Sequence, residues 1–215
     1  SRLIDANILS RSEAALGGYT FRHALVRDTA YQSLSLRTRQ RYHALILRTL
    51  IDRQPDLEAR QPELLAQHEL GAGLIGEAIE HWQQAGGSTA ARSAFLESAA
   101  HYRKALEQLG ALPPSRERDR REIMLRVGLG LALVSTQGFA SKEVEQTYTR
   151  AAELVQVGQE LPGAVLIGLY AGVSVGVDRE GVMRLLPVVE RQAVGSADPE
   201  MQLWGHSAIG MALFF

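Results

Sequence analysis

The sequence contains no cysteine, which excludes both a disulfide framework and a thiolate metal site. Its formal net charge is only −1, because 23 Lys and Arg residues oppose 24 Asp and Glu residues. A chain with this balance has no overall basic field that would attract nucleic acid. Residues 1–9 lack the continuous apolar segment of a signal peptide. Together these absences favour a soluble chain in a reducing compartment, and we expect a cytoplasmic location.

The sequence also lacks a hydrophobic run long enough to cross a bilayer. The longest stretch without a charge is residues 161–177, which is shorter than the roughly 20 apolar residues of a transmembrane helix. Gly168, Gly172 and Gly176 within it have the spacing of a membrane helix-dimer face. Because acidic residues flank the stretch on both sides, we expect a buried helix whose glycines permit close helix contact, and no membrane association.

Motifs for catalysis, metals and cofactors are missing as well. The six histidines form no HExxH motif and no i, i+4 pair that could bind a metal from one helix face. Residues 71–76, GAGLIG, match the dinucleotide fingerprint GxGxxG in letters, but that motif needs a preceding strand and a helix is expected there. We therefore expect no catalytic, metal-binding or cofactor-binding residue, and we interpret these glycines as the turn of a helical hairpin.

The strongest positive signal is a spacing of large and small residues within positions 79–112. A glycine lies four residues after a tryptophan, and a serine lies twelve residues after that glycine. A tyrosine follows the serine by four residues, and an alanine follows the tyrosine by three. This order resembles the tetratricopeptide repeat (TPR) of about 34 residues, in which small residues let two antiparallel helices touch and aromatic residues fill the gap between them. The residues are Trp82, Gly86, Ser98, Tyr102 and Ala105.

Part of the same spacing recurs after a linker. Ala132 lies twelve residues before Val144, and Tyr148 and Ala151 follow at four and three more. The resemblance implies an all-α, TPR-like right-handed superhelix of antiparallel helix pairs.

The periodicity along the chain agrees with a helical fold that has one short β-hairpin. Residues 1–9 predict a short helix, and residues 19–22 predict a strand with a partner near residues 14–16. Helices are expected over residues 23–34 and 38–53, the latter with an apolar stripe. The stripe residues are Tyr42, Leu45, Ile46, Thr49 and Leu50. Further helices are expected over 62–70, 74–86, 96–109, 116–137, 141 onward, 163–177, 179–194 and from 199.

A cluster of arginines near the N-terminus has two interpretations. It is interleaved with Tyr31 and Tyr42, so it could contact the phosphates of a nucleic acid. Alternatively it flanks a helix junction and pairs with Asp28 or a neighbouring domain, which is the interpretation that we favour. The arginines are Arg22, Arg27, Arg37, Arg39 and Arg41.

Residues 19–34, YTFRHALVRDTAYQSL, resemble a join found in large bacterial signalling ATPases of the STAND type. There the join connects the winged-helix module behind the nucleotide-binding domain to a TPR array. Four later segments continue the likeness in the same order: RQRYH at 39–43, ELLAQH at 63–68, EAIEHW at 77–82 and GFASKEVE at 138–145. Within that group the chain is similar to class III adenylate or guanylate cyclases with an ATPase module, and next to ATPase-linked LuxR-type regulators.

The resemblance implies three parts and a non-catalytic role. Residues 1–22 would be the tail of a winged helix, 23–112 a helical linker with the first TPR-like repeats, and 113–215 further helix pairs that continue beyond the sequence. The fragment would be a regulatory, protein-binding scaffold in the parent, an adenylate cyclase in cAMP signalling. Its partner would be another protein or a neighbouring domain, and the exposed end at Phe214 and Phe215 would favour dimers.

Three alternatives to that function stay open. The chain could be the regulatory segment of a LuxR-type transcriptional regulator, or a helical module that contacts nucleic acid. It could also be a small-molecule hydrolase or transferase with a helical fold, for which a deep polar pocket with two shifted titratable groups would be evidence.

Overall fold

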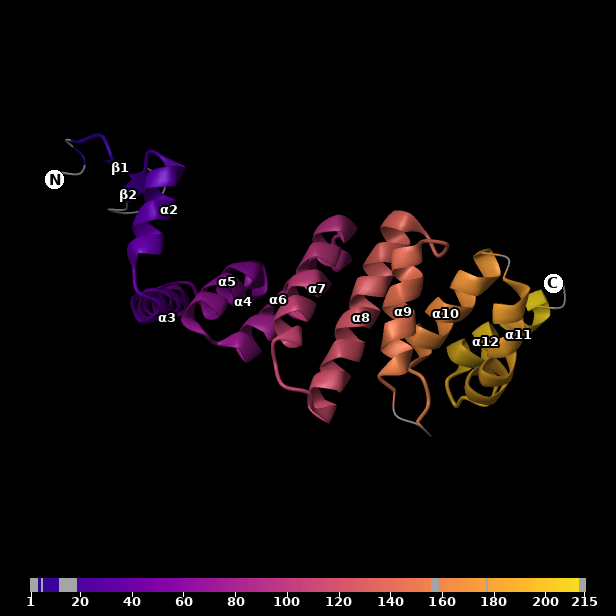
Figure 1. Ribbon diagram of the computed structural model, residues 1–215. Helices are drawn as coiled ribbons and strands as arrows, with labels where there is room; N and C mark the ends of the chain where they lie inside the picture. Colours follow the sequence, from indigo (N-terminus) through magenta and orange to yellow (C-terminus); the bar gives the residue numbers. More distant parts are fainter. Residues whose placement is uncertain (1–3, 5, 12–18, 156–158, 177, 213–215) are drawn as a thin grey trace.

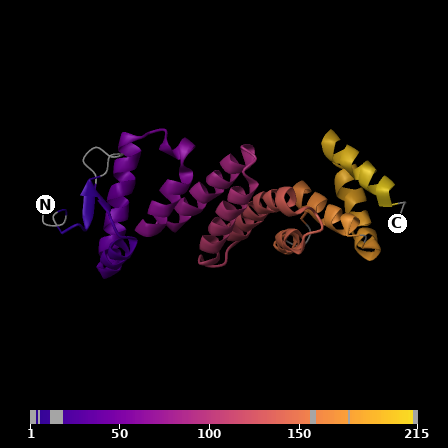
Figure 2. The same cartoon turned by 90° about the horizontal axis from the view of Figure 1, so that it is seen from above.

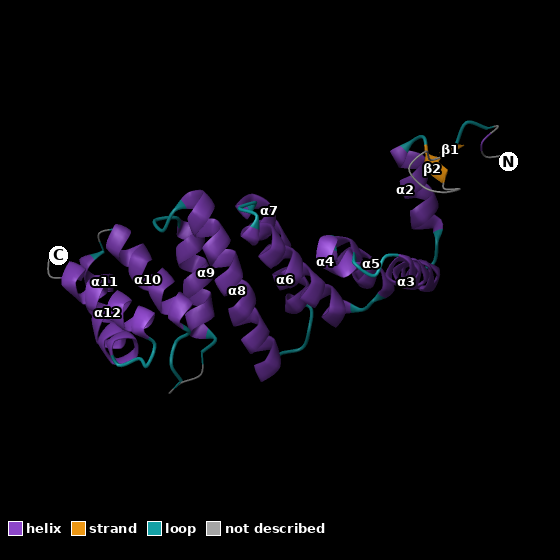
Figure 3. Ribbon diagram, turned by 180° about the vertical axis from the view of Figure 1, so that it is seen from behind, coloured by secondary structure: helices purple, strands orange, loops and turns teal. Residues whose placement is uncertain are grey.

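The computed structural model describes residues 4, 6–11, 19–155, 159–176 and 178–212. These residues are mostly helical with one two-stranded sheet, so the all-α class with a small β-hairpin is confirmed at that level. The helices follow one another along an extended, curved array (Figures 1 and 2), and strands occur only at its N-terminal end (Figure 3). None of the described helices combines the length and apolar character of a membrane span.

The elements are as follows in chain order. The N-terminal region has β1 (Leu9–Arg11), β2 (Tyr19–Phe21), α2 (Ala24–Ser33) and α3 (Leu36–Arg53). The array continues with α4 (Leu57–Arg60), α5 (Pro62–Ala72), α6 (Ile75–Ala91), α7 (Phe95–Gly110), α8 (Arg116–Gln137) and α9 (Lys142–Glu153). It ends with α10 (Gly163–Val175), α11 (Arg179–Val189), the π-helical turn η1 (Glu190–Val194) and α12 (Pro199–Ala212).

The N-terminal hairpin differs from the expectation in its first strand. β1 pairs antiparallel with β2, with Leu9 opposite Phe21 and Arg11 opposite Tyr19. The helix expected over residues 1–9 is therefore wrong at Leu9, and the partner expected near residues 14–16 lies outside the described residues. The strand expected over residues 19–22 is confirmed as β2, whereas the three residues of β1 carry no alternating pattern that would have located it.

The face of α3 that packs is not the one that the periodicity indicated. Leu47 is buried against α5 and Leu50 is half-buried beside it. Tyr42, Leu45 and Ile46, which belong to the expected stripe, are 44%, 60% and 41% exposed. The stripe is present, but the burial that such a pattern normally indicates is wrong for these residues, because α3 carries apolar side chains on two faces and only one of them meets α5.

The apolar core runs along the array and is not gathered at one centre. A small cluster of leucines joins α3, α4 and α5, the main cluster extends from α5 to the start of α10, and a third joins α10, α11 and α12. Each helix packs chiefly on its neighbours in sequence. Contacts are consequently local, as in solenoid proteins.

Tyr102 of α7 lies between glycines of two neighbouring helices. A Cβ atom on Gly86 of α6 would stand 2.8 Å from the Tyr102 ring, and one on Gly128 of α8 would overlap that ring. The Ser98 hydroxyl donates to the Gly86 carbonyl oxygen at 2.8 Å, which ties α7 to α6 beside the ring. Only glycine leaves room for the ring at both positions.

Tyr148 of α9 repeats this arrangement one helix pair later. A Cβ atom on Gly130 of α8 would lie 2.5 Å from the Tyr148 ring, and one on Gly168 of α10 would overlap it. Gly128 and Gly130 are two residues apart, about 200° around a helix, so α8 presents glycine to a tyrosine on each of two sides. Both phenols are neutral, since burial raises the pKa of Tyr102 and of Tyr148.

Serine and glycine close the helix ends. The Ser115 side chain accepts a hydrogen bond from the Arg118 N–H at 3.1 Å, and α8 begins there. Gly73 follows α5 with φ +86°, and Gly138 follows α8 with φ +78°, values that favour glycine over other residues. The expected bounds 116–137 of α8 are confirmed. A serine cap precedes its first residue and a glycine follows its last.

Candidate functional site

The nine residues expected to mark the repeats are all buried in the core. They therefore hold the helices together and cannot themselves contact a ligand, so a binding site must be sought on the surfaces that they shape. They are Trp82, Gly86, Ser98, Tyr102, Ala105, Ala132, Val144, Tyr148 and Ala151.

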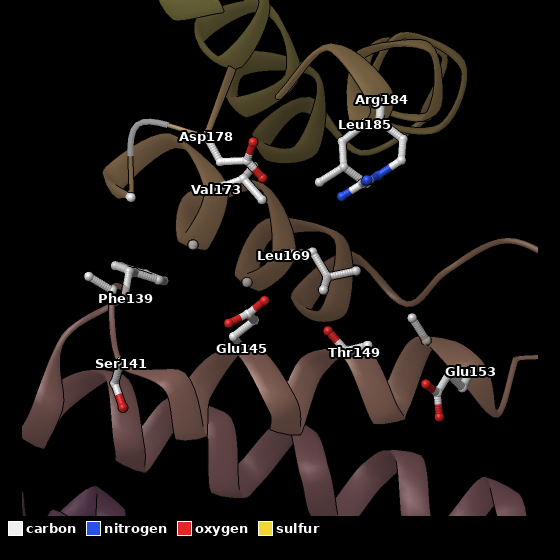
Figure 4. A pocket seen from close by; sticks show the side chains of 15 residues that line it. Phe139, Ser141, Glu145, Thr149, Glu153, Leu169, Val173, Asp178, Arg184 and Leu185 are labelled. Atoms are coloured by element: carbon white, nitrogen blue, oxygen red, sulfur yellow. The ribbon is translucent and has the colours of Figure 1, made fainter. Parts of the chain in front are cut away.

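A groove of about 420 Å³ lies between α9, α10 and α11 (Figure 4). Helix α10 forms the floor, α9 one wall and α11 the other, and the loop before α9 closes one end. Pockets for small ligands have about 300–1,000 Å³, so the groove could take a small molecule or a short stretch of peptide. Its lining includes Leu169, Gly172 and Val173 on the floor, Glu145 and Thr149 on one wall, and Arg184 and Leu185 on the other.

The charges of the groove lie around an apolar floor. Asp178 accepts a hydrogen bond from the Gly181 N–H at 3.0 Å, and Glu153 accepts one from Arg150 at 3.2 Å. The side chains of Glu145 and Arg184 form no hydrogen bond or ion pair with another described residue. A ligand in the groove would therefore meet one available carboxylate and one available guanidinium group on opposite walls.

Glycine makes the groove deep. A Cβ atom on Gly172 would have no neighbour closer than the Phe139 carbonyl oxygen at 3.7 Å, so a side chain there would project into open space. Gly168, one turn earlier, packs against Tyr148. Two glycines of the uncharged stretch 161–177 thus have different roles. Gly168 permits close helix contact as expected, and Gly172 leaves room for the groove.

Residues 172–176, GVSVG, match the letters of the nucleophile motif GxSxG, which the expectation of no covalent nucleophile overlooked. That motif requires a serine on a sharp turn between a strand and a helix. Ser174 instead lies inside α10, and helix precedes it. The match has the letters of the motif without its geometry.

Histidines that are scattered in sequence meet at helix contacts near the N-terminal end. Tyr31 Oη lies 2.9 Å from His43 Nε2, and His43 Nδ1 lies 3.0 Å from His68 Nδ1, which links α2, α3 and α5. Burial lowers the pKa of His68, and the neighbouring His43 lowers it further. The ring of His43 packs where Gly71 has no side chain. This chain of groups is a structural contact between helices.

Two further pairs follow along the array. The buried Glu69 accepts a hydrogen bond from His81 at 2.7 Å, and burial raises the pKa of this carboxyl group. His101 stacks on Trp82 with ring centroids 5.4 Å apart, and burial lowers the pKa of His101. These shifted groups belong to helix contacts and do not line the groove.

No group of three or more His, Asp or Glu side chains that could hold a metal occurs in the part of the chain that the structure describes. The GxGxxG match is divided between two helices: Gly71 lies in α5 and Gly76 in α6, with the left-handed Gly73 between them. This is the helical-hairpin turn expected from the sequence, and it offers no strand-to-helix cradle for a pyrophosphate.

The arginine cluster lies on α2, α3 and the residues before them. Arg27 forms the expected ion pair with Asp28, at 2.8 Å. Two other guanidinium groups lie over tyrosine rings: Arg39 over Tyr31 at 5.4 Å and Arg41 over Tyr42 at 5.5 Å from the ring centroids.

Comparison with known proteins gives one distant relative. No family model and no solved structure matches the chain. The chain is 28% identical, over 139 residues, to an uncharacterised protein of Rhizobium meliloti (strain 1021). The matched part is 64% of this chain but 13% of the relative, so the chain spans only a small part of the length of the protein that it matches.

Proposed function

We propose that this chain is a non-catalytic interaction segment of a larger signalling ATPase, folded as a TPR-like right-handed superhelix. The observation that carries the proposal is the repeated packing of a tyrosine between glycines of the helices on either side, at Tyr102 and again at Tyr148. Aromatic rings that fill the space between small residues of stacked hairpins are the packing rule of such arrays. The three parts proposed from the sequence, 1–22, 23–112 and 113–215, belong to this proposal.

The likeness of residues 19–34 to the join between a winged helix and a TPR array supports a multidomain parent, as does a relative far longer than this chain. An adenylate cyclase with an ATPase module is the parent that we propose, with a LuxR-type regulator as the alternative. In either parent, nucleotide chemistry belongs to other domains, and this segment acts in the cytoplasm through contact with a protein or a neighbouring domain.

The groove between α9 and α11 is the site through which contact would act. A ligand held between Glu145 and Arg184 would touch α9, α10 and α11 at once. Since α10 also packs on α12, a change in its position would alter the C-terminal end of the array. Binding would thereby bias how an adjoining module sits, which is a coupling between two sites.

Replacement of Gly172 by leucine tests this role of the groove. The Cβ atom of the new side chain would fit without a clash, because only the Phe139 carbonyl oxygen lies near it, and the rest of the side chain would occupy the groove. We expect the full-length variant to fold and to show a changed rate of ATP hydrolysis or of cyclic nucleotide formation. Gly76→Leu is the matched control, because a Cβ atom there meets nothing within 4 Å and Gly76 lies far from the groove.

Two results would contradict the proposal in different ways. A folded Gly172→Leu parent protein with unchanged ATP hydrolysis and cyclisation would exclude the groove as a regulatory site. Turnover of ATP by the purified 215-residue chain would exclude a non-catalytic segment.

A further inference from the structure

One side of α3 is apolar, and no other described residue covers it. Tyr42, Leu45, Ile46 and Thr49 stand at i, i+3, i+4 and i+7 and are all exposed, whereas the opposite side of the helix buries Leu47. An amphipathic stripe of this spacing is the side that a helix normally packs on another element. Leu45 has the largest exposed fraction of the three apolar side chains, 60%.

The neighbouring α2 does not cover this stripe. It is a helix of 10 residues without a single buried residue, and Leu25 is 78% exposed. A helix of this length is marginal in water without tertiary packing. Within the described residues, α2 is held to α3 mainly by Tyr31, which contacts His43 and Arg39.

A row of arginines runs beside the apolar stripe. Arg37, Arg41 and Arg48 are spaced by four and seven residues, so they share one flank of the helix, and all three are exposed. Residues 19–53 contain seven arginines, no lysine and two acidic residues, a formal charge of +5. Since the whole chain has −1, the remaining residues together carry −6. The positive charge is thus concentrated where the stripe is exposed.

We propose that the outer face of α3, defined by Tyr42, Leu45, Ile46 and Thr49 with the flanking arginine row, binds an acidic amphipathic helix of a partner protein. Helices α5 to α9 each pack between helices on two sides, whereas the described contacts of α3 with other helices lie mainly on one side, with α5 and to a smaller extent α4. A further helix would continue the stacking. Its apolar stripe would cover Leu45 and Ile46, and Asp or Glu residues on its flank would pair with the arginines.

Nucleic acid fits this face less well. Its grooves offer no aliphatic surface to cover Leu45 and Ile46, and the Arg41 guanidinium group already lies over the Tyr42 ring on which a base could stack. An anionic bilayer would meet a stripe of only about two turns, a small apolar area for insertion. An acidic helix matches both the width of the stripe and the positive charge of the arginines beside it.

Two synthetic helical peptides test the proposal with the full chain. Each has about 18 residues, long enough to be partly helical, with leucines at i, i+3, i+4 and i+7. One carries Glu at its other positions and the second carries Lys. We expect the Glu peptide to bind, with affinity that falls as salt rises, and the Lys peptide not to bind. Fluorescence polarisation of labelled peptides measures both.

Three variants locate the binding. The double substitution Leu45→Ser with Ile46→Ser should weaken binding of the Glu peptide at least tenfold, whereas Leu203→Ser on α12, exposed to a similar degree at 70%, should not change it. Arg41→Glu with Arg48→Glu should reverse the preference toward the Lys peptide. Circular dichroism should show that each variant keeps its helix content.

Every other outcome overturns the proposal. Equal binding of the two peptides, or binding insensitive to the serine and charge-reversal variants, would exclude this face as a specific site. Binding of phosphatidylserine vesicles or duplex DNA through the same residues, without the Glu peptide, would assign it to those ligands. Self-association that is lost in the double serine variant would assign it to a second copy of the chain.

Discussion

Replacement of Gly128 by alanine should destabilise the array, although alanine normally stabilises a helix. Glycine in the middle of a helix costs about 1 kcal/mol relative to alanine, so the substitution begins with a gain of that size. The new methyl group would overlap the Tyr102 ring, which Gly86 confines from the other side. Overpacking of a close-packed core costs about 1–3 kcal/mol. The net expectation is a loss of about 0–2 kcal/mol in the free energy of unfolding.

Gly76→Ala separates the two effects. Gly76 also lies in a helix, but a Cβ atom there would meet nothing within 4 Å, so only the helix-forming gain remains. Gly76 lies in the first turn of α6, where the helix-forming gain is smaller than in a helix interior, so the difference between the two variants is a lower bound on the overpacking cost of about 1–3 kcal/mol. Urea unfolding followed by far-ultraviolet circular dichroism measures both variants against the unmodified chain.

A double-mutant cycle identifies the ring as the cause. In a Tyr102→Leu background the ring is gone, and Gly128→Ala should stabilise the chain as Gly76→Ala does. If Gly128→Ala instead stabilises the chain with Tyr102 in place, the tyrosine is not confined between its two glycines. The TPR-like interpretation would then lose its main support.

Three further predictions concern helix ends, an ion cluster and pH. Ser115→Ala should lower stability by about 1 kcal/mol, because the N-cap hydrogen bond to the Arg118 N–H is lost, and urea unfolding measures this directly. Glu122→Gln should lower the free energy of unfolding by about 1–3 kcal/mol in the same assay. The buried Glu122 accepts hydrogen bonds from Arg126 at 2.8 Å and from Arg150 at 3.3 Å, and so joins α8 to α9. An Arg126→Gln variant, which leaves Arg150 in place, should lose less stability. Stability should decline as pH falls below 6.5, because the pKa values of His68 and His101 are lowered in the folded state and the unfolded chain takes up these protons first. Unfolding at pH 7.5 and 5.5 measures the decline, and its persistence in a His68→Gln, His101→Gln double variant would assign it to other groups.

Helix bounds followed from the sequence where a terminal signal stands at each end. The bounds of α8 expected from the charged patch that begins at Arg116 and from Gly138 are those observed, and Ser115 caps the start. The burial of Tyr102 and Tyr148 was likewise indicated by spacing, because an aromatic residue at a fixed distance from small residues reports a contact within one helical hairpin. These signals depend only on residues that are close together in the sequence, so a sequence pattern is able to reveal them.

Features that depend on how distant helices meet did not follow from the sequence. Helix α3 carries apolar residues on two faces, and only the position of α5 determines that Leu47, and not Leu45, is buried. The pairing of His43 with His68 joins residues 25 apart on different helices, so no spacing rule applied to it. The groove has the same origin: Glu145 and Arg184 come from α9 and α11, which meet across α10.

The shared helix α8 offers a route by which the proposed interaction segment could transmit a signal through packing. Gly128 receives Tyr102 from α7, and Gly130 receives Tyr148 from α9, so a rotation of α8 cannot relieve one contact without disturbing the other. Tyr148 also packs on Gly168, in the helix that forms the groove floor. Because packed cores shift between discrete arrangements and do not deform continuously, a ligand that moves α10 would be felt at Tyr148 and then at α8. That sequence of contacts links the groove to the middle of the array through side chains and glycines alone.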